Sequence, residues 1–332
     1  MVKTKIIIDT DGVADDIRAI SLALNHKDVE VIAITTVAGC VSTEQSVANV
    51  ARTLRANGNV KVPVFKGCGK PLIEAGLTEQ EPVFFGADGL GDTPKEWPKV
   101  MADDAESCDQ NEHAALAMIR LFSMNPGTIK LVCIGPLTNV ALALKLNPEF
   151  AKWPKNIVIM GGNVYAQGNV KPSSTAEFNF GFDPEAAHIV VKEMKCPMII
   201  CPWETFLNES TRNTIDFHAH LLLDIPLARF FELATRTGRR ILEKDGCQFA
   251  FCDEICIAAA IDPTNLIVER KMLRGVVELN GKHTRGQLAL SWMNDVSEDT
   301  HPITFVMKYN VELLNQMIID AIHESTKKVE HV

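Results

Sequence analysis

Short apolar runs rich in β-branched residues alternate along this chain with longer amphipathic stretches. Such a run suits a strand buried on both faces, and an amphipathic stretch suits the helix that returns the chain to the next parallel strand. We expect strands at residues 6–9, 29–36, 62–65, 129–134, 157–160 and 198–201. We expect helices at residues 16–24, 43–57, 112–124, 137–146, 184–192, 255–260 and 311–323. The alternation predicts an α/β fold with an open, mainly parallel sheet and helices on both faces.

The length of 332 residues allows two small domains, but α/β chains of this size often form one domain around one sheet. We therefore expect a single Rossmann-like domain over residues 1–332. No apolar run is long enough to span a bilayer, so we expect no membrane partner. Residues 1–4 lead straight into the first strand and leave no room for a signal peptide, which predicts a cytoplasmic location.

The charge balance and the cysteines argue against two further kinds of site. The formal net charge is −9, and the chain has no basic stripe, so a phosphate backbone would be repelled and no nucleic acid is expected as a partner. The nine cysteines are odd in number and include no CxxC pair. They suit a reducing compartment and do not predict a zinc site.

Four carboxylates follow the first expected strand within eight positions: Asp9, Asp11, Asp15 and Asp16. Ligands of open parallel sheets bind beyond the carboxyl ends of the strands, so chemistry is expected here. Crowded carboxylates raise one another's pKa unless a cation neutralises them, and hard oxygen ligands suit Ca²⁺ or Mg²⁺. A helix N-terminus, capped by Asp15 and favoured by Asp16, would account for only two of the four. The cluster therefore predicts a metal site.

Residues 8–13, taken alone, resemble the nucleophile motif of haloacid dehalogenase-like phosphatases. In that family the first Asp attacks phosphorus and the second acts as acid and base. Such a phosphatase also needs a Ser or Thr at the end of the second strand run and a Lys downstream. Neither has a convincing place in this chain, so the phosphatase is the weaker alternative.

Residues 9–20 also resemble the motif DTDPGxDDAxAL of the nucleoside hydrolases that prefer inosine and uridine. The likeness continues in order along nearly the whole chain, which makes it more specific than any one segment. The further matching segments are AITTVAG at 33–39, GPLTNVA at 135–141, MGG at 160–162, AEFN at 176–179, DPEAA at 183–187 and FCD at 251–253. The resemblance implies an enzyme that hydrolyses the N-glycosidic bond of ribonucleosides to ribose and a free base. It also implies a homodimer or homotetramer.

The resemblance implies a role for each matching residue. Its calcium ligands would be Asp11, Asp16, Asp253 and the backbone carbonyl of Ile134. Asp11 would also be the base that deprotonates a metal-bound water, and Asp9 would orient the metal ligands from behind. The residues implied to contact ribose are Asp15, Met160, Asn169, Glu177, Asn179 and Asp253.

Three positions depart from the family pattern: Cys40 replaces an Asn, and Phe85 and Cys252 each replace a His. All three belong to the side where the base leaves. Cys252 is the candidate acid for the departing base, because a thiol has a pKa of about 8.5. The alternative is that Cys252 only packs, since free cysteine is among the residues most often buried. The departures also leave open a non-catalytic nucleoside- or sugar-binding relative, although the retained Asp11 favours an enzyme.

The expected substrate is a purine nucleoside such as inosine. A purine accepts a proton at N7 and offers a large face for stacking on Phe85 or Trp203, for which packing is the alternative role. Long loops are expected at residues 78–109 and 164–179, and loops of that length in a compact domain are often functional.

Overall fold

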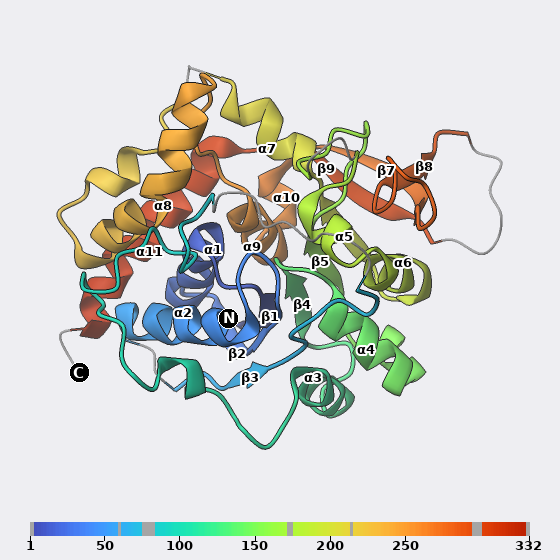
Figure 1. The fold of residues 1–332 in the computed structure, drawn as a ribbon, viewed down its shortest axis with the longest axis horizontal. Coiled ribbons are helices and arrows are strands. Elements are labelled where there is room, and N and C mark those ends of the chain that lie inside the picture. Colours follow the sequence, from blue (N-terminus) through green and yellow to red (C-terminus); the bar gives the residue numbers. More distant parts are fainter. Residues whose placement is uncertain are drawn as a thin grey trace.

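One sheet of nine strands runs through the molecule in the order β3-β2-β1-β4-β5-β6-β9-β7-β8 (Figure 1). Neighbouring strands from β3 to β9 in this order are parallel, whereas β7 pairs antiparallel with both β9 and β8. The computed structural model describes residues 3–58, 61–74, 84–170, 175–212, 215–293 and 301–329. The strands are β1 (Thr4–Thr10), β2 (Val29–Thr36), β3 (Val64–Lys66), β4 (Lys130–Cys133), β5 (Ile157–Met160), β6 (Met198–Cys201), β7 (Ile267–Val277), β8 (Leu288–Ser291) and β9 (Ile303–Tyr309).

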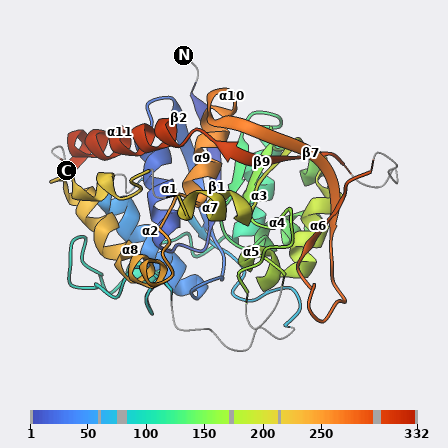
Figure 2. The same cartoon turned by 90° about the horizontal axis from the view of Figure 1, so that it is seen from above.

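Helices cover both faces of this sheet. They are α1 (Ala14–Asn25), α2 (Thr43–Ala56), α3 (Ala114–Ser123), α4 (Thr138–Leu146), α5 (Phe178–Phe182), α6 (Pro184–Glu193), α7 (Trp203–Ser210), α8 (Pro226–Lys244), α9 (Asp253–Ile261), α10 (Pro263–Leu266) and α11 (Val311–Val329), with short 3-10 turns η1 (Asp104–Glu106), η2 (Pro148–Lys152) and η3 (Ala219–Leu222). Figures 1 and 2 show α1, α2, α8 and α11 on one side of the sheet and α3, α4 and α6 on the other.

The alternation of side chains along each strand divides the core into two layers. Ile6 and Ile8 of β1 pack in the layer that contains α1, α8, α9 and α11. Ile7, between them, packs in the layer that contains α3, α4 and α6. Because β1 is buried on both faces, its sequence is a continuous apolar run rather than an alternating one.

The fold class predicted from the sequence is confirmed, and so are the central elements. The expected strands 29–36, 157–160 and 198–201 coincide with β2, β5 and β6, and the strand expected at 62–65 is β3 at Val64–Lys66. The sequence did not predict β7, β8 and β9, nor the helices α5, α7 and α10. Among the described residues, no helix is both long enough and apolar enough to cross a membrane.

Candidate active site

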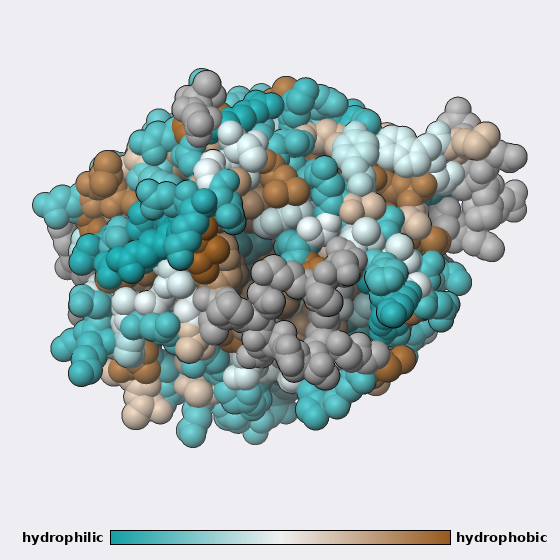
Figure 3. Space-filling model, turned by 45° about the horizontal axis from the view of Figure 1, so that its top comes forward, coloured by the Kyte–Doolittle hydropathy of each residue, from teal (hydrophilic) through white to brown (hydrophobic). Residues whose placement is uncertain are grey.

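A cavity of about 440 Å³ lies at the carboxyl ends of the parallel strands. The face drawn in Figure 3 is hollowed near its centre, with hydrophobic side chains close to the depression. Apart from Asp9, every residue that the sequence assigns to the site lines the cavity: Asp11, Asp15, Asp16, Cys40, Phe85, Ile134, Met160, Asn169, Glu177, Asn179, Cys252 and Asp253. Its size falls within the range of small-molecule sites.

One wall of the cavity is formed by carboxylates from two helix starts and the turn after β1. Asp15 and Asp16 lie in the first turn of α1, and Asp253 begins α9. Asp11, in the turn between β1 and α1, accepts a 2.7 Å hydrogen bond from the backbone N–H of Cys40 at its Oδ2. Asp16 accepts hydrogen bonds from the Thr10 hydroxyl and, at 3.1 Å, from the backbone N–H of Val13.

The electrostatics of this wall fit a bound cation. Burial raises the pKa of Asp15 to about 7, and it raises those of Asp16 and Asp253 well above the usual range, with the neighbouring carboxylates adding to each shift. Ligand atoms of Asp15, Cys252 and Asp253 all lie within 4.8 Å of one another. Oδ1 of Asp15 is buried and has no hydrogen-bond partner in the described part of the chain. Carboxylates crowded in this way are neutralised by a divalent cation, for which hard oxygen ligands are suited.

Asp9 lies behind this wall rather than in the cavity. Its Oδ1 accepts hydrogen bonds from the Thr35 hydroxyl at 2.6 Å and from the Asn139 amide at 2.8 Å. Burial raises the pKa of Asp9 to about 7, and these two hydrogen bonds oppose the rise. Thr35 and Asn139 belong to the segments 33–39 and 135–141, so three of the matching segments meet at one carboxylate.

A second wall joins the end of β5 to the start of α5. Glu177 caps α5, and its carboxylate accepts hydrogen bonds from the backbone N–H groups of Asn179 at 2.8 Å and Gly162 at 2.9 Å. The Asn179 amide donates to the carbonyl of Ile134 at 3.3 Å and to that of Met160 at 3.2 Å. These contacts fix two polar side chains and a carbonyl beside the carboxylates.

The remaining wall is aromatic, and the sequence indicated only Phe85 and Trp203 in it. The lining also includes Phe84, Phe178, Phe182, Phe206 and Phe249, together with Leu242. Phe84 stacks on Phe249 with ring centroids 5.8 Å apart, and Trp203 stacks on Phe206 at 4.5 Å. In the sequence, only the Phe84-Phe85 pair in a glycine-rich loop indicated an aromatic wall. An isolated aromatic residue after a strand usually packs in the core, so it does not indicate a ligand site.

Comparison with known proteins matches residues 6–316 to the family model described as inosine-uridine preferring nucleoside hydrolase. The chain belongs to this family. It is 32% identical to the inosine-uridine preferring nucleoside hydrolase of Crithidia fasciculata over 96% of this chain and 97% of that one. It is 39% identical to a probable uridine nucleosidase 1 of Oryza sativa subsp. japonica over 57% and 55% of the two chains. A solved inosine-guanosine nucleoside hydrolase shares 30% identity with a TM-score of 0.83, covering 96% of this chain and 99% of that one.

The family membership makes this chain a nucleoside hydrolase, an N-glycosidase. The match extends over far more than the segment 8–13 on which the phosphatase alternative rested, and that alternative is not supported.

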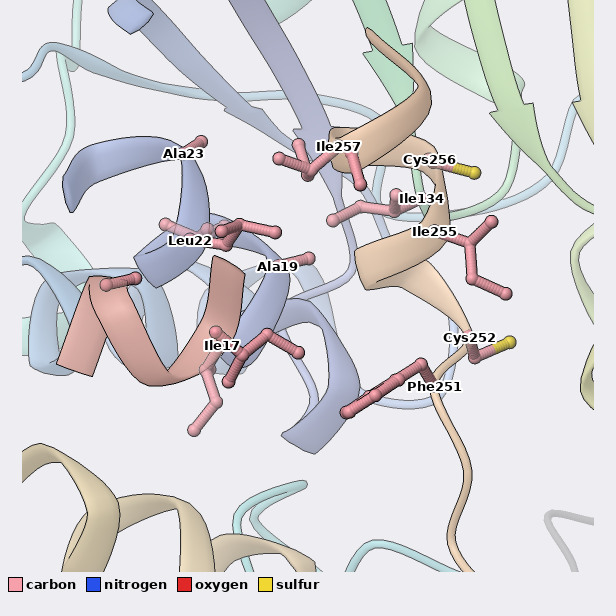
Figure 4. Close-up of a cluster of buried hydrophobic side chains, with 14 of the residues drawn as sticks. Ile17, Ala19, Leu22, Ala23, Ile134, Phe251, Cys252, Ile255, Cys256 and Ile257 are labelled. Carbon is pink, nitrogen blue, oxygen red and sulfur yellow. The ribbon is translucent and has the colours of Figure 1, made fainter. Parts of the chain in front are cut away.

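The three departures from the nucleoside hydrolase pattern all line the cavity. Cys252 and Cys256 point to the same side of α9, whereas Phe251 points back toward α1 (Figure 4). The Cys252 side chain is 5% exposed, and burial together with Asp253 raises its pKa well above the ordinary range. Burial also raises the pKa of Cys40 well above that range, with Asp11 adding to the shift. Both thiols therefore hold their protons at neutral pH.

Proposed function

We propose that this nucleoside hydrolase is calcium-dependent, prefers purine ribonucleosides such as inosine, and uses Asp11 as the base that takes the proton from the attacking water. The observation that carries the proposal is the arrangement of the cavity, with carboxylates along one wall and aromatic rings along another. The N-glycosidic bond breaks through a sugar that resembles an oxocarbenium ion, which a set of carboxylates stabilises.

The chain supplies the cation site. Asp11, Asp16, Asp253 and the carbonyl of Ile134 would hold Ca²⁺, since hard oxygen ligands are what this ion prefers. A bound Ca²⁺ supplies positive charge that lowers the pKa of the attacking water. Asp9 would keep this set in register, because its own contacts tie β1 to β2 and to the first turn of α4.

The ribose would lie between the carboxylates and the start of α5. Asp15, Asn169, Glu177, Asn179 and Asp253 are proposed to bind its hydroxyls, and Met160, which is 5% exposed, to pack against the ring. Hydrogen bonds from backbone N–H groups hold Glu177 in place before substrate binds, so its side chain loses little conformational freedom on binding.

The base would lie among the aromatic side chains. A purine has a larger face than a pyrimidine for the rings of Phe85 and Trp203, which is the support for a purine preference. The names of the relatives include inosine, uridine and guanosine, so these names do not indicate which base this enzyme prefers. We propose that the Cys252 thiol gives its proton to the departing base.

Ribose release from inosine and from uridine, measured as reducing sugar before and after removal of metal with a chelator, tests the proposal. We expect faster release from inosine, loss of release with chelator, and recovery with Ca²⁺ but less with Mg²⁺. Recovery by Mg²⁺ alone would overturn the calcium assignment. Metal-dependent binding of inosine in calorimetry without any ribose release would favour the non-catalytic binding protein.

Two expectations from the sequence remain predictions: a cytoplasmic location, and a homodimer or homotetramer. The single domain over residues 1–332 is likewise proposed, on the support of the continuous sheet. Light scattering after size-exclusion chromatography measures the assembly directly.

A further inference from the structure

Two opposite charges are buried directly behind the carboxylate wall. The side chains of Arg18 and Glu254 are both 0% exposed, and Nε of Arg18 lies 2.5 Å from Oε1 of Glu254. Neither residue lines the cavity. Arg18 follows Asp16 by two positions on α1, and Glu254 follows Asp253 on α9. The pair therefore joins the two helix starts that carry the carboxylates.

The surroundings hold this pair in one arrangement. The Arg18 guanidinium lies 4.8 Å from the ring centroid of Phe249 and 5.7 Å from that of Phe251. Oε2 of Glu254 accepts a 2.9 Å hydrogen bond from the backbone N–H of Cys252. Within the described residues, no guanidinium nitrogen of Arg18 meets an acceptor with hydrogen-bond geometry. The charge of Glu254 is therefore what holds the cation.

Asp15 is the other carboxylate within the influence of Arg18. The two residues are three positions apart on α1, a spacing that places side chains on the same face of a helix. Even so, Oδ1 of Asp15 has no hydrogen-bond partner among the described residues. Arg18 is paired with Glu254 and leaves this oxygen free.

We infer that Glu254 is a positioning residue that holds the Arg18 cation away from Asp15, so that Asp15 remains free to bind a ribose hydroxyl. The inference rests on the role proposed above for Asp15. A buried guanidinium without its partner is strongly destabilised and pairs with the nearest available carboxylate. Without Glu254, that carboxylate is Asp15, and the substrate then competes with Arg18 for it.

The epistasis between two substitutions tests this inference. Glu254→Gln keeps the shape of the side chain and removes its charge, so we expect KM for inosine to rise by about tenfold or more, with a smaller change in kcat. Adding Arg18→Met removes the cation that captures Asp15, and the double variant should return KM to within about threefold of the parent. A purely structural role predicts that KM follows the loss of the buried pairing, so that Arg18→Met alone, which leaves Glu254 unpaired but frees no cation, raises KM as much as Glu254→Gln. The inference predicts instead that KM of Arg18→Met stays within about threefold of the parent.

Glu185→Gln is the matched control. It removes the charge from a partly buried ion pair, with Arg285 at 2.8 Å, whose residues do not line the cavity. Its KM should stay within about twofold of the parent value, as expected for a substitution that does not contact substrate.

A crystal structure of the Glu254→Gln variant gives a readout that does not depend on catalysis. We expect an Arg18 guanidinium nitrogen within salt-bridge distance of Asp15. An Arg18 that stays in its original place would overturn the inference even if inosine is hydrolysed. Conversely, if the parent protein releases no ribose, the proposed function is wrong, but the crystal structure of the variant still tests whether Glu254 holds Arg18 away from Asp15. If Glu254→Gln does not fold, the double variant tests the inference, because it carries neither buried charge. A tenfold higher KM of the double variant would then contradict the inference.

Discussion

The backbone N–H of Cys40 donates a 2.7 Å hydrogen bond to Oδ2 of Asp11, across the gap between the turns that follow β2 and β1. The contact uses the backbone of Cys40, so it does not depend on the Asn that relatives often carry at this position. It fixes one oxygen of the proposed base and limits rotation of the carboxylate. The Cys40 thiol adds a side-chain hydrogen bond to the same carboxylate, so both the backbone and the side chain at position 40 hold Asp11.

Asp11→Asn should reduce kcat for inosine by about 10²- to 10⁴-fold, the usual contribution of a general base. The amide cannot accept the proton from water, although it has nearly the same shape. Steady-state kinetics with saturating Ca²⁺ separates this loss from weaker metal binding. The matched control is Asp245→Asn, because Asp245 is exposed at the end of α8 and should leave kcat unchanged. Retention of kcat by Asp11→Asn within threefold would contradict the assignment.

Gly39→Ala should displace Asp11 and lower kcat/KM by about tenfold or more, as small misplacements of a catalytic group do. A Cβ at position 39 would lie 2.8 Å from Cβ of Asp11, closer than carbon atoms approach. Gly69→Ala is the control, since a Cβ there would meet only Thr43 Oγ1 at 3.5 Å. Equal kinetics for the two variants would show that the turn after β2 absorbs the extra methyl group.

The metal-free protein should become less stable as the pH rises from 5 to 8. Burial raises the pKa values of Asp9, Asp15 and Glu177 to about 7, so the folded protein binds protons that the unfolded chain has already released. This contribution is present at low pH and is lost as the pH passes through 7. Burial also raises the pKa values of the proposed ligands Asp16 and Asp253, so Ca²⁺ binding displaces protons there and its stabilising effect should grow with pH.

Thermal denaturation with chelator and with excess Ca²⁺ measures both trends. We expect Tm of the metal-free protein to fall by at least about 2 °C between pH 5 and pH 8, the order of change that 1 kcal/mol produces in a chain of this size. A shift by Ca²⁺ that is equal at both pH values would mean that these carboxylates do not exchange protons for metal.

Cys252→Ala should slow the hydrolysis of inosine far more than that of 4-nitrophenyl riboside. Burial raises the pKa of the Cys252 thiol, so the thiol holds a proton for the purine but is a weaker acid than an ordinary thiol, whereas nitrophenolate leaves without a proton. We expect kcat for inosine to fall by about 10²-fold and kcat for the nitrophenyl substrate to stay within threefold. Cys256→Ala, one helical turn further on α9 and fully buried, is the control. Equal losses on both substrates would indicate that Cys252 only packs.

The strands at the centre of the sheet could be predicted because each is a continuous apolar run. Those at its edge could not: β7 is exposed or only partly buried over most of its length, with Glu269, Arg270 and Lys271 in its first half. This stretch is antiparallel and faces solvent, so it lacks the pattern of a doubly buried strand.

The carboxylate wall could be predicted because its residues lie in dense, ordered motifs. Arg18 and Glu254 were missed, although Arg18 lies within the segment 9–20 and Glu254 directly follows the segment 251–253. A charge inside an amphipathic helix usually faces solvent, and the sequence does not show that α1 and α9 bury these two against each other. Phe249 and Phe206 were missed for a related reason, since an aromatic side chain carries no sign of whether it faces the core or a ligand.

The cavity draws Phe84, Phe85, Trp203 and Phe206 from segments that carry none of the proposed metal ligands. Those ligands lie at strand ends and at two helix starts, and Asp9 of β1 contacts Thr35 of β2 and Asn139 of α4, so a change at one of these segments disturbs the others. The four aromatic side chains come from separate loops and helix ends that contribute one or two rings each. Mutation can therefore exchange one nucleobase preference for another, ring by ring, in a lineage that keeps its sugar chemistry unchanged.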